Sequence, residues 1–148
     1  MIPSTLDQYL AVARSSLVRL EPADAYAATQ RGALLVDIRP EFQRRRDGEV
    51  PDAIIVERNH LEWRLHPDSD ARIPEATSAD VQWVVLCEEG YASSLAAAVL
   101  QSLGLRRATD VVGGLRAWRA ADLPIRPSGE VSAPRLAPEP GSAGKLAG

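Results

Sequence analysis

Apolar and polar positions along the chain follow two kinds of pattern. Short, mainly apolar runs, rich in β-branched residues, occur at residues 33–38, 53–56, 81–86 and 108–112. Such runs are typical of strands that are buried on both faces of a parallel sheet. Segments with helical spacing separate and follow these runs, at residues 21–31, 41–47, 59–65, 93–103 and 115–121. Strands that alternate with helices predict an α/β fold with a parallel sheet.

The N-terminal segment has a pattern of its own. Residues 4–14 place Leu6, Leu10 and Ala13 on one face of a helix, which predicts a short accessory helix packed on the rest of the domain. Residues 17–20 are short and apolar and are expected to form an edge strand.

The C-terminal segment has too few large apolar residues to contribute to a hydrophobic core. From Pro127 onward the chain consists mainly of Pro, Gly, Ala and Ser, with few large apolar residues. Such a segment cannot bury enough surface to offset the entropy of ordering. We therefore expect an N-terminal accessory helix at residues 1–16, one domain at residues 17–126 and a disordered tail at residues 127–148.

Composition narrows the class of protein. The formal net charge is −3, so nothing points to nucleic acid or to an anionic membrane as a partner. No apolar run reaches membrane-spanning length, and the N-terminus has no basic region followed by an apolar one. A single cysteine excludes an internal disulfide and multi-cysteine zinc clusters, and no metal site is expected. A lone reactive thiol would suit a reducing, cytoplasmic environment.

That cysteine stands at a chemically favourable point. Cys87 follows the apolar run 81–86 and precedes a short loop and the helix predicted at 93–103. A strand, tight loop and helix can cradle an anion with convergent amides and the helix N-terminus, which favours a reactive thiolate. A lone cysteine more often packs as a small hydrophobe. The polar character of Glu88 and Glu89 favours a cysteine that faces the loop.

The loop sequence CEEGYAS, residues 87–93, resembles the active-site loop of rhodanese domains, Cys-x-x-Gly-x-x between a strand and a helix. Other segments resemble rhodanese motifs in the expected order: LLVDIR, GEVPDAI, VGGLRAW and the closing Leu-Pro at residues 123–124. The resemblance covers roughly residues 18–125. The chain departs from the family at Glu49, where a histidine is usual.

The resemblance implies a rhodanese-like fold with a five-stranded, mainly parallel sheet and helices on both faces. It also implies a sulfurtransferase that moves a sulfane sulfur through a Cys87 persulfide to a thiol, cyanide or protein acceptor. The donor would be a small sulfur compound or a persulfide-bearing protein, and no cofactor is needed. The persulfide charge would be held by the loop amides of Glu88, Glu89, Gly90, Tyr91, Ala92 and Ser93.

Two arginines are further candidates for binding the substrate. Arg39 ends the apolar run 33–38 and could face an anion, or it could brace its own loop through Asp37, which the resemblance favours. Arg58 could be a cationic neighbour of Cys87, or it could pair with Glu62 one helical turn later.

Three other functions compete with this prediction. A phosphatase or arsenate reductase would resemble Cys-x5-Arg, but Ser93 occupies the arginine position, and a bidentate arginine is hard to replace at an oxyanion site. A non-catalytic rhodanese-type module that binds a partner would not require Cys87. A sulfur carrier for one protein would share the chemistry and differ in its acceptor.

The two acids that follow Cys87 lead to a prediction about the donor. Glu88 and Glu89 would repel thiosulfate, a dianion, so thiosulfate is expected to be a poor donor.

Overall fold

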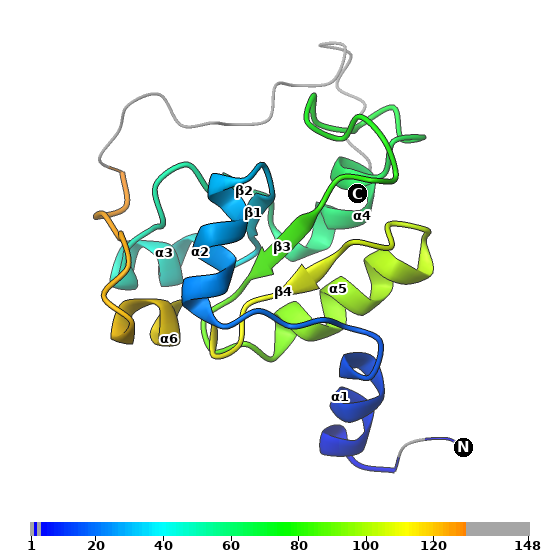
Figure 1. Cartoon of the computed structure of the whole chain (residues 1–148), viewed down its shortest axis with the longest axis horizontal. Helices are drawn as coiled ribbons and strands as arrows, with labels where there is room; N and C mark the ends of the chain where they lie inside the picture. Colours follow the sequence, from blue (N-terminus) through cyan, green and yellow to red (C-terminus); the bar gives the residue numbers. More distant parts are fainter. Residues whose placement is uncertain (1, 3, 130–148) are drawn as a thin grey trace.

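The computed structural model describes residue 2 and residues 4–129, and it has a parallel sheet at its centre (Figure 1). The strands lie in the order β2-β1-β3-β4 and every neighbouring pair is parallel. Their bounds are β1 Leu34–Asp37, β2 Ile54–Ile55, β3 Trp83–Leu86 and β4 Thr109–Asp110. The four buried runs are thus confirmed as strands, each shorter than predicted.

Helices separate the strands as predicted. The described residues form α1 Leu6–Arg14, α2 Pro22–Gln30, α3 Glu41–Asp47, the 3-10 turn η1 Arg58–His60, α4 Leu61–Leu65, α5 Ala92–Ser102 and α6 Gly114–Ala120. None of these helices combines the length and apolarity that a membrane crossing requires.

The expectation of a fifth strand at residues 17–20 is wrong. Only Leu20 pairs, through one isolated parallel bridge to Val111. Two backbone hydrogen bonds hold it, from Leu20 N to Asp110 O (3.0 Å) and from Val112 N to Leu20 O (2.8 Å). Pro22 has no N–H to donate to a ladder and begins α2 directly, so the pairing cannot extend. The sheet therefore has four strands.

Alternate residues of each strand enter two separate core layers. One layer contains Trp83, Val85 and residues of α4 and α5, and the other contains Val84, Leu86 and residues of α2 and α6. This follows from the two-residue period of a strand, which sends neighbours to opposite faces. Helices on both faces are therefore confirmed, and Cys87 lies on the α5 side.

The N-terminal helix packs less deeply than its pattern predicted. Its N-cap is Thr5, whose Oγ1 accepts from Gln8 N. α1 packs against α5 (Figure 1). Leu10 and Ala13 are half-buried, but Leu6 is 76 % exposed, so the predicted apolar face is only partly used.

Most of the predicted C-terminal tail, residues 130–148, lies outside the described residues. At its beginning, Ser128 Oγ donates to Glu49 Oε2 (3.0 Å), and Glu49 also pairs with Arg126 through an antiparallel bridge.

The α5 layer gives a direct test of the core. Leu100 is fully buried there, whereas Leu103 at the end of α5 is 42 % exposed. Leu100→Ala should lower the free energy of unfolding by about 2–5 kcal/mol, because it removes buried methyl groups and leaves a cavity. The matched Leu103→Ala should cost under about 1 kcal/mol. Urea denaturation measures both, and equal losses would contradict the core assignment.

Candidate active site

The carboxyl ends of the strands bring three polar side chains to one edge of the sheet. Asp37 ends β1, Cys87 follows β3 and Asp110 ends β4. All the strands run in the same direction, so these ends meet at a single edge. In open parallel sheets this edge is where ligands bind.

The sulfur of Cys87 accepts two hydrogen bonds from its own loop. Gly90 N lies 3.1 Å from Sγ and Ser93 N lies 3.3 Å from it. Cys87 is only 6 % exposed and also packs in the α5 core layer. Ser93 lies in the first turn of α5, whose unpaired N–H groups carry partial positive charge. The cysteine is therefore buried, as expected of a cysteine that packs as a small hydrophobe. Its sulfur also accepts hydrogen bonds from two loop amides, as expected of a stabilised thiolate.

The start of α6 holds the beginning of this loop. Leu115 N donates to Cys87 O (2.8 Å) and Arg116 N donates to Glu88 O (3.1 Å). Gly114 makes this approach possible, since its φ is +62° and a Cβ there would lie 2.5 Å from Cys87 O. Glycine at the first position of α6 is thus needed for backbone contact with the cysteine loop.

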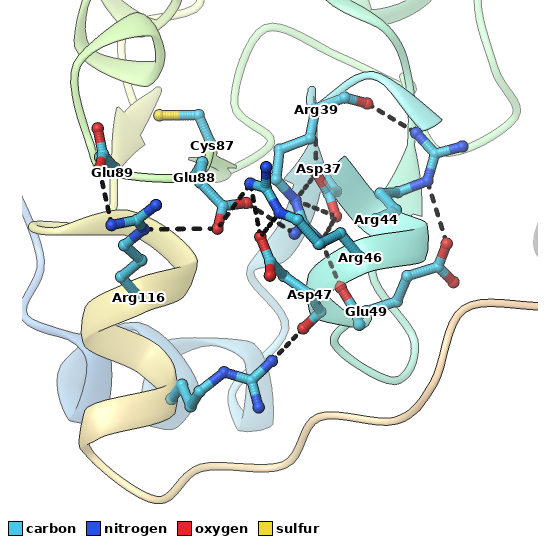
Figure 2. A network of polar contacts seen from close by, with 12 residues as sticks. Asp37, Arg39, Arg44, Arg46, Asp47, Glu49, Cys87, Glu88, Glu89 and Arg116 are labelled. Carbon is cyan, nitrogen blue, oxygen red and sulfur yellow. Dashed lines mark hydrogen bonds and ion pairs between the residues drawn. The ribbon is translucent and has the colours of Figure 1, made fainter. Parts of the chain in front are cut away.

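Glu88 points away from the sulfur and toward α3 (Figure 2). Its Oε1 accepts from Arg39 Nη1 (3.1 Å), and Arg39 also donates to Asp37 Oδ2 and to the carbonyl of Gly48. Arg39 is 1 % exposed, so the structure shows the bracing alternative for this arginine. Neither Glu88 nor Arg39 has its charged end in the sulfur's surroundings.

The Glu88 carboxyl also contacts a second acid. Burial raises its pKa above the usual range, and a hydrogen bond with Asp47 raises it further, against the lowering effect of Arg39. Asp47 changes in the opposite direction: hydrogen bonds from Arg46 and Glu88 lower its pKa to about 2. Glu88 is therefore the member of the pair that takes up a proton first as pH falls.

Glu89 differs from Glu88 in exposure, although both acids pair with Arg116. Its side chain is half exposed, and Oε2 pairs with Arg116 Nη1 at 3.1 Å (Figure 2). Tyr91 is 59 % exposed, and Ala92 is exposed as well. These residues form the solvent side of the loop.

Arg58 forms the pair that its helical spacing allowed. Nη1 lies 2.9 Å from Glu62 Oε1, and the arginine side chain is 37 % exposed. The pair with Glu62 is the alternative that the sequence offered to a role of Arg58 beside Cys87.

Four residues of the site were not predicted from the sequence: Arg14, Arg19, Ser94 and Asp110. Asp110 is fully buried and accepts from the hydroxyls of Ser93 and Ser94, each at 2.7 Å, and from Arg19 Nε at 2.8 Å. An aspartate inside the otherwise mainly apolar run 108–112 was the available signal for it. The two arginines carry no such signal, because their partners are far away in the sequence.

Within residues 2 and 4–129, no three His, Cys, Asp or Glu side chains gather closely enough to hold a metal ion.

A buried cysteine in an amide-lined loop, at the carboxyl edge of a parallel sheet, defines a cysteine-loop α/β domain. The family described as Rhodanese-like domain matches residues 21–121. The chain belongs to the rhodanese-like domain family, as the sequence resemblance predicted.

Three similar proteins show how far the likeness extends. A curated thiosulfate sulfurtransferase, GlpE, of Pseudomonas savastanoi is 33% identical over 104 residues, which cover 69% of this chain and 87% of that protein. A solved protein of unknown function from Rhodopseudomonas palustris, called a possible tyrosine phosphatase, is 34% identical with a TM-score of 0.75, covering 85% of this chain and 97% of that one. The polysulfide-sulfur transferase homodimer of Wolinella succinogenes shares the fold at 22% identity and a TM-score of 0.68, covering 86% and 93%.

The carboxyl pair gives a pH-dependent test. Asp47→Asn should lower the pKa of Glu88, because it removes the hydrogen bond and the negative charge that both raise it. An NMR titration of the side-chain carboxyl carbons measures the shift, and Asp68→Asn, at an exposed loop position, is the control. An unchanged or higher Glu88 pKa in Asp47→Asn would contradict the coupling.

Proposed function

We propose that this protein is a sulfurtransferase in which Cys87 carries a sulfane sulfur as a persulfide. The observation that carries the proposal is the pair of amide hydrogen bonds to Sγ from Gly90 and Ser93. Amides in fixed positions can stabilise negative charge on sulfur without reorganising during the reaction. The naming of the curated relatives as thiosulfate sulfurtransferases supports the same chemistry.

The reaction has two displacements. The Cys87 thiolate attacks the outer sulfur of a donor such as thiosulfate, the donor's S–S bond breaks, and sulfite leaves with the electron pair of that bond. The product is a Cys87 persulfide whose negative charge replaces that of the thiolate. An acceptor nucleophile then takes the terminal sulfur and returns the thiolate, so cyanide becomes thiocyanate and a thiolate becomes a persulfide.

Phosphatase chemistry fits this loop poorly. The position that would supply the oxyanion-binding arginine is Ser93, which is fully buried and donates its hydroxyl proton to Asp110. A short hydroxyl bound to a buried carboxylate offers an incoming phosphate no bidentate cation. The likeness to the Rhodopseudomonas palustris protein therefore supports the fold, and the possible tyrosine phosphatase activity of that protein is not carried over to this chain.

A partner-binding module without catalysis remains the second candidate, and the intact cysteine favours the enzyme. A buried thiol kept only for packing would not need two amides directed at its sulfur. A dedicated sulfur carrier would use the same first displacement. In the second displacement it would hand its sulfur to one acceptor protein only.

The sulfur-transfer proposal is tested by replacing Cys87. Cys87→Ser should abolish sulfur transfer and remain folded, because the change is close to isosteric. Intact-mass measurement of the wild type should show one added sulfur after treatment with a donor, removable by cyanide, and Cys87→Ala should show none. Sulfurtransferase turnover in either variant would refute the nucleophile, and a wild type that never gains sulfur would favour the partner-binding module.

The donor prediction now rests on Glu89 alone. Glu88 is buried and paired with Arg39, so its charge is neutralised away from the loop mouth, whereas Glu89 is exposed and paired with Arg116. We propose that thiosulfate is accepted and that Glu89 limits its capture. An unscreened charge pair at 4 Å in water is worth about 1 kcal/mol, or roughly fivefold in rate.

Glu89→Lys should therefore raise kcat/KM for thiosulfate about fivefold or more at low ionic strength, and the gain should shrink in salt. Arg116→Ala should lower kcat/KM, because it removes the cation that pairs closely with Glu89 and more distantly with Glu88. The control Asp80→Lys makes the same charge change at an exposed site before β3, at the opposite edge of the sheet. Equal effects of Glu89→Lys and Asp80→Lys would show that only net charge matters.

A further inference from the structure

We propose that Arg14, on the helix that precedes the family's region of the chain, is a positioning residue for the cysteine loop. The helix α1 would then be part of the active site rather than an accessory. This inference rests on the proposed sulfur transfer and deepens it. The family match begins at residue 21, so Arg14 lies outside the part of the chain that the family describes.

The first observation concerns the carbonyl of Gly90. Its oxygen accepts from Arg14 Nη2 at 2.7 Å, from Arg19 Nη2 at 3.0 Å and, at the longer distance of 3.3 Å, from Ser94 Oγ. The N–H of the same glycine donates to Cys87 Sγ. Gly90 thus touches the sulfur on one side and is held by two arginines on the other.

Holding that carbonyl also orients the next amide. In a trans peptide the C=O and the following N–H point in opposite directions. Because the Gly90 oxygen is bound to Arg14 and Arg19, the N–H of Tyr91 must point away from the two arginines. Gly90 has a φ of +89°, a backbone conformation that glycine alone adopts readily. Because glycine has no Cβ to restrict its neighbouring peptide planes, the hydrogen bonds to its carbonyl help to hold this plane in place.

Arg14 reaches two further parts of the loop. Its Nε donates to Ser94 Oγ at 3.0 Å, and its guanidinium carbon lies 5.8 Å from the ring centroid of Tyr91. Ser94 Oγ in turn donates to Asp110 Oδ2. One half-buried guanidinium therefore connects the Gly90 peptide, the Tyr91 ring and the first turn of α5.

The two arginines differ in what their removal would leave behind. Arg19 pairs with Asp110, whose side chain is fully buried, so its loss would leave an uncompensated buried charge. The ion pairs among the described residues do not include Arg14, so its removal would leave none of their carboxylates without its cation. Arg14 is therefore the cleaner residue to test.

The test compares Arg14→Ala, Arg14→Lys and a matched arginine control in the full-length protein. Arg45→Ala is the control, since Arg45 is 72 % exposed and pairs with Glu41 on its own helix, α3. Three readouts are used: kcat and KM for sulfur transfer, the pH profile of Cys87 alkylation by iodoacetamide, and thermal unfolding. The alkylation profile reports thiolate stabilisation, which a purely structural role of Arg14 would not move.

We expect Arg14→Ala to lower kcat roughly tenfold to a hundredfold. Removing a direct oxyanion donor typically lowers kcat by about 10²–10³, and the effect of Arg14 should not exceed that range because Arg14 acts through Gly90. Its alkylation profile should move to higher pH. Arg14→Lys should restore part of both effects, since it keeps the charge but not the planar fork. Arg45→Ala should match the wild type.

The proposal is overturned if folded Arg14→Ala keeps the wild-type kcat and alkylation profile, or if its activity falls only in proportion to the unfolded fraction. Should Arg14→Ala fail to fold, Arg14→Gln keeps the stem and a polar end without the charge and is judged by the same criteria. A wild type that never takes up sulfur would refute the proposed function separately, since alkylation of the reduced protein still measures the role of Arg14.

Discussion

The cysteine loop depends on one constraint: when its peptide planes turn their N–H groups toward the sulfur, its carbonyls must find donors elsewhere. Buried backbone oxygens without partners are costly, so the donors are part of the site. The carbonyls of Cys87 and Glu88 accept from the first turn of α6, that of Gly90 accepts from Arg14 and Arg19, and that of Tyr91 accepts from Ser94 N. Donors on α1, at Arg19 and on α6, together with Ser94 of α5, therefore help to determine the shape of the loop around the sulfur.

The charges around the loop follow the same principle. Arg39 lies buried between Asp37 and Glu88, and Asp110 lies buried beneath Arg19. Buried ion pairs of this kind add little net stability, but removing one partner typically costs about 3–5 kcal/mol. Their contribution is to fix β1, β4 and the loop relative to one another. They also turn the charge of Glu88 inward, whereas the side chain of Glu89 stays exposed.

Much of the fold followed from local sequence. Apolar runs of strand length and helical spacing are properties of neighbouring residues, and they predicted all four strands and the helices between them. The predicted fifth strand was wrong because Leu20 forms a single bridge and α2 begins two residues later, at Pro22. Cys87 was located correctly because a lone cysteine between a buried strand and a glycine-containing loop is a local signal.

The sequence by itself determined the class of fold, the position of the cysteine loop and the family. Only the tertiary structure decided what each charged residue does. Glu88 and Glu89 are identical and adjacent in sequence, yet one is buried against Arg39, 49 residues away, and the other is exposed beside Arg116. Arg14 lies 76 residues from the carbonyl that it binds. Local patterns report burial and periodicity, whereas the partner of a charge depends on which distant segments meet at the carboxyl edge of the sheet, and that is settled only when the chain has folded.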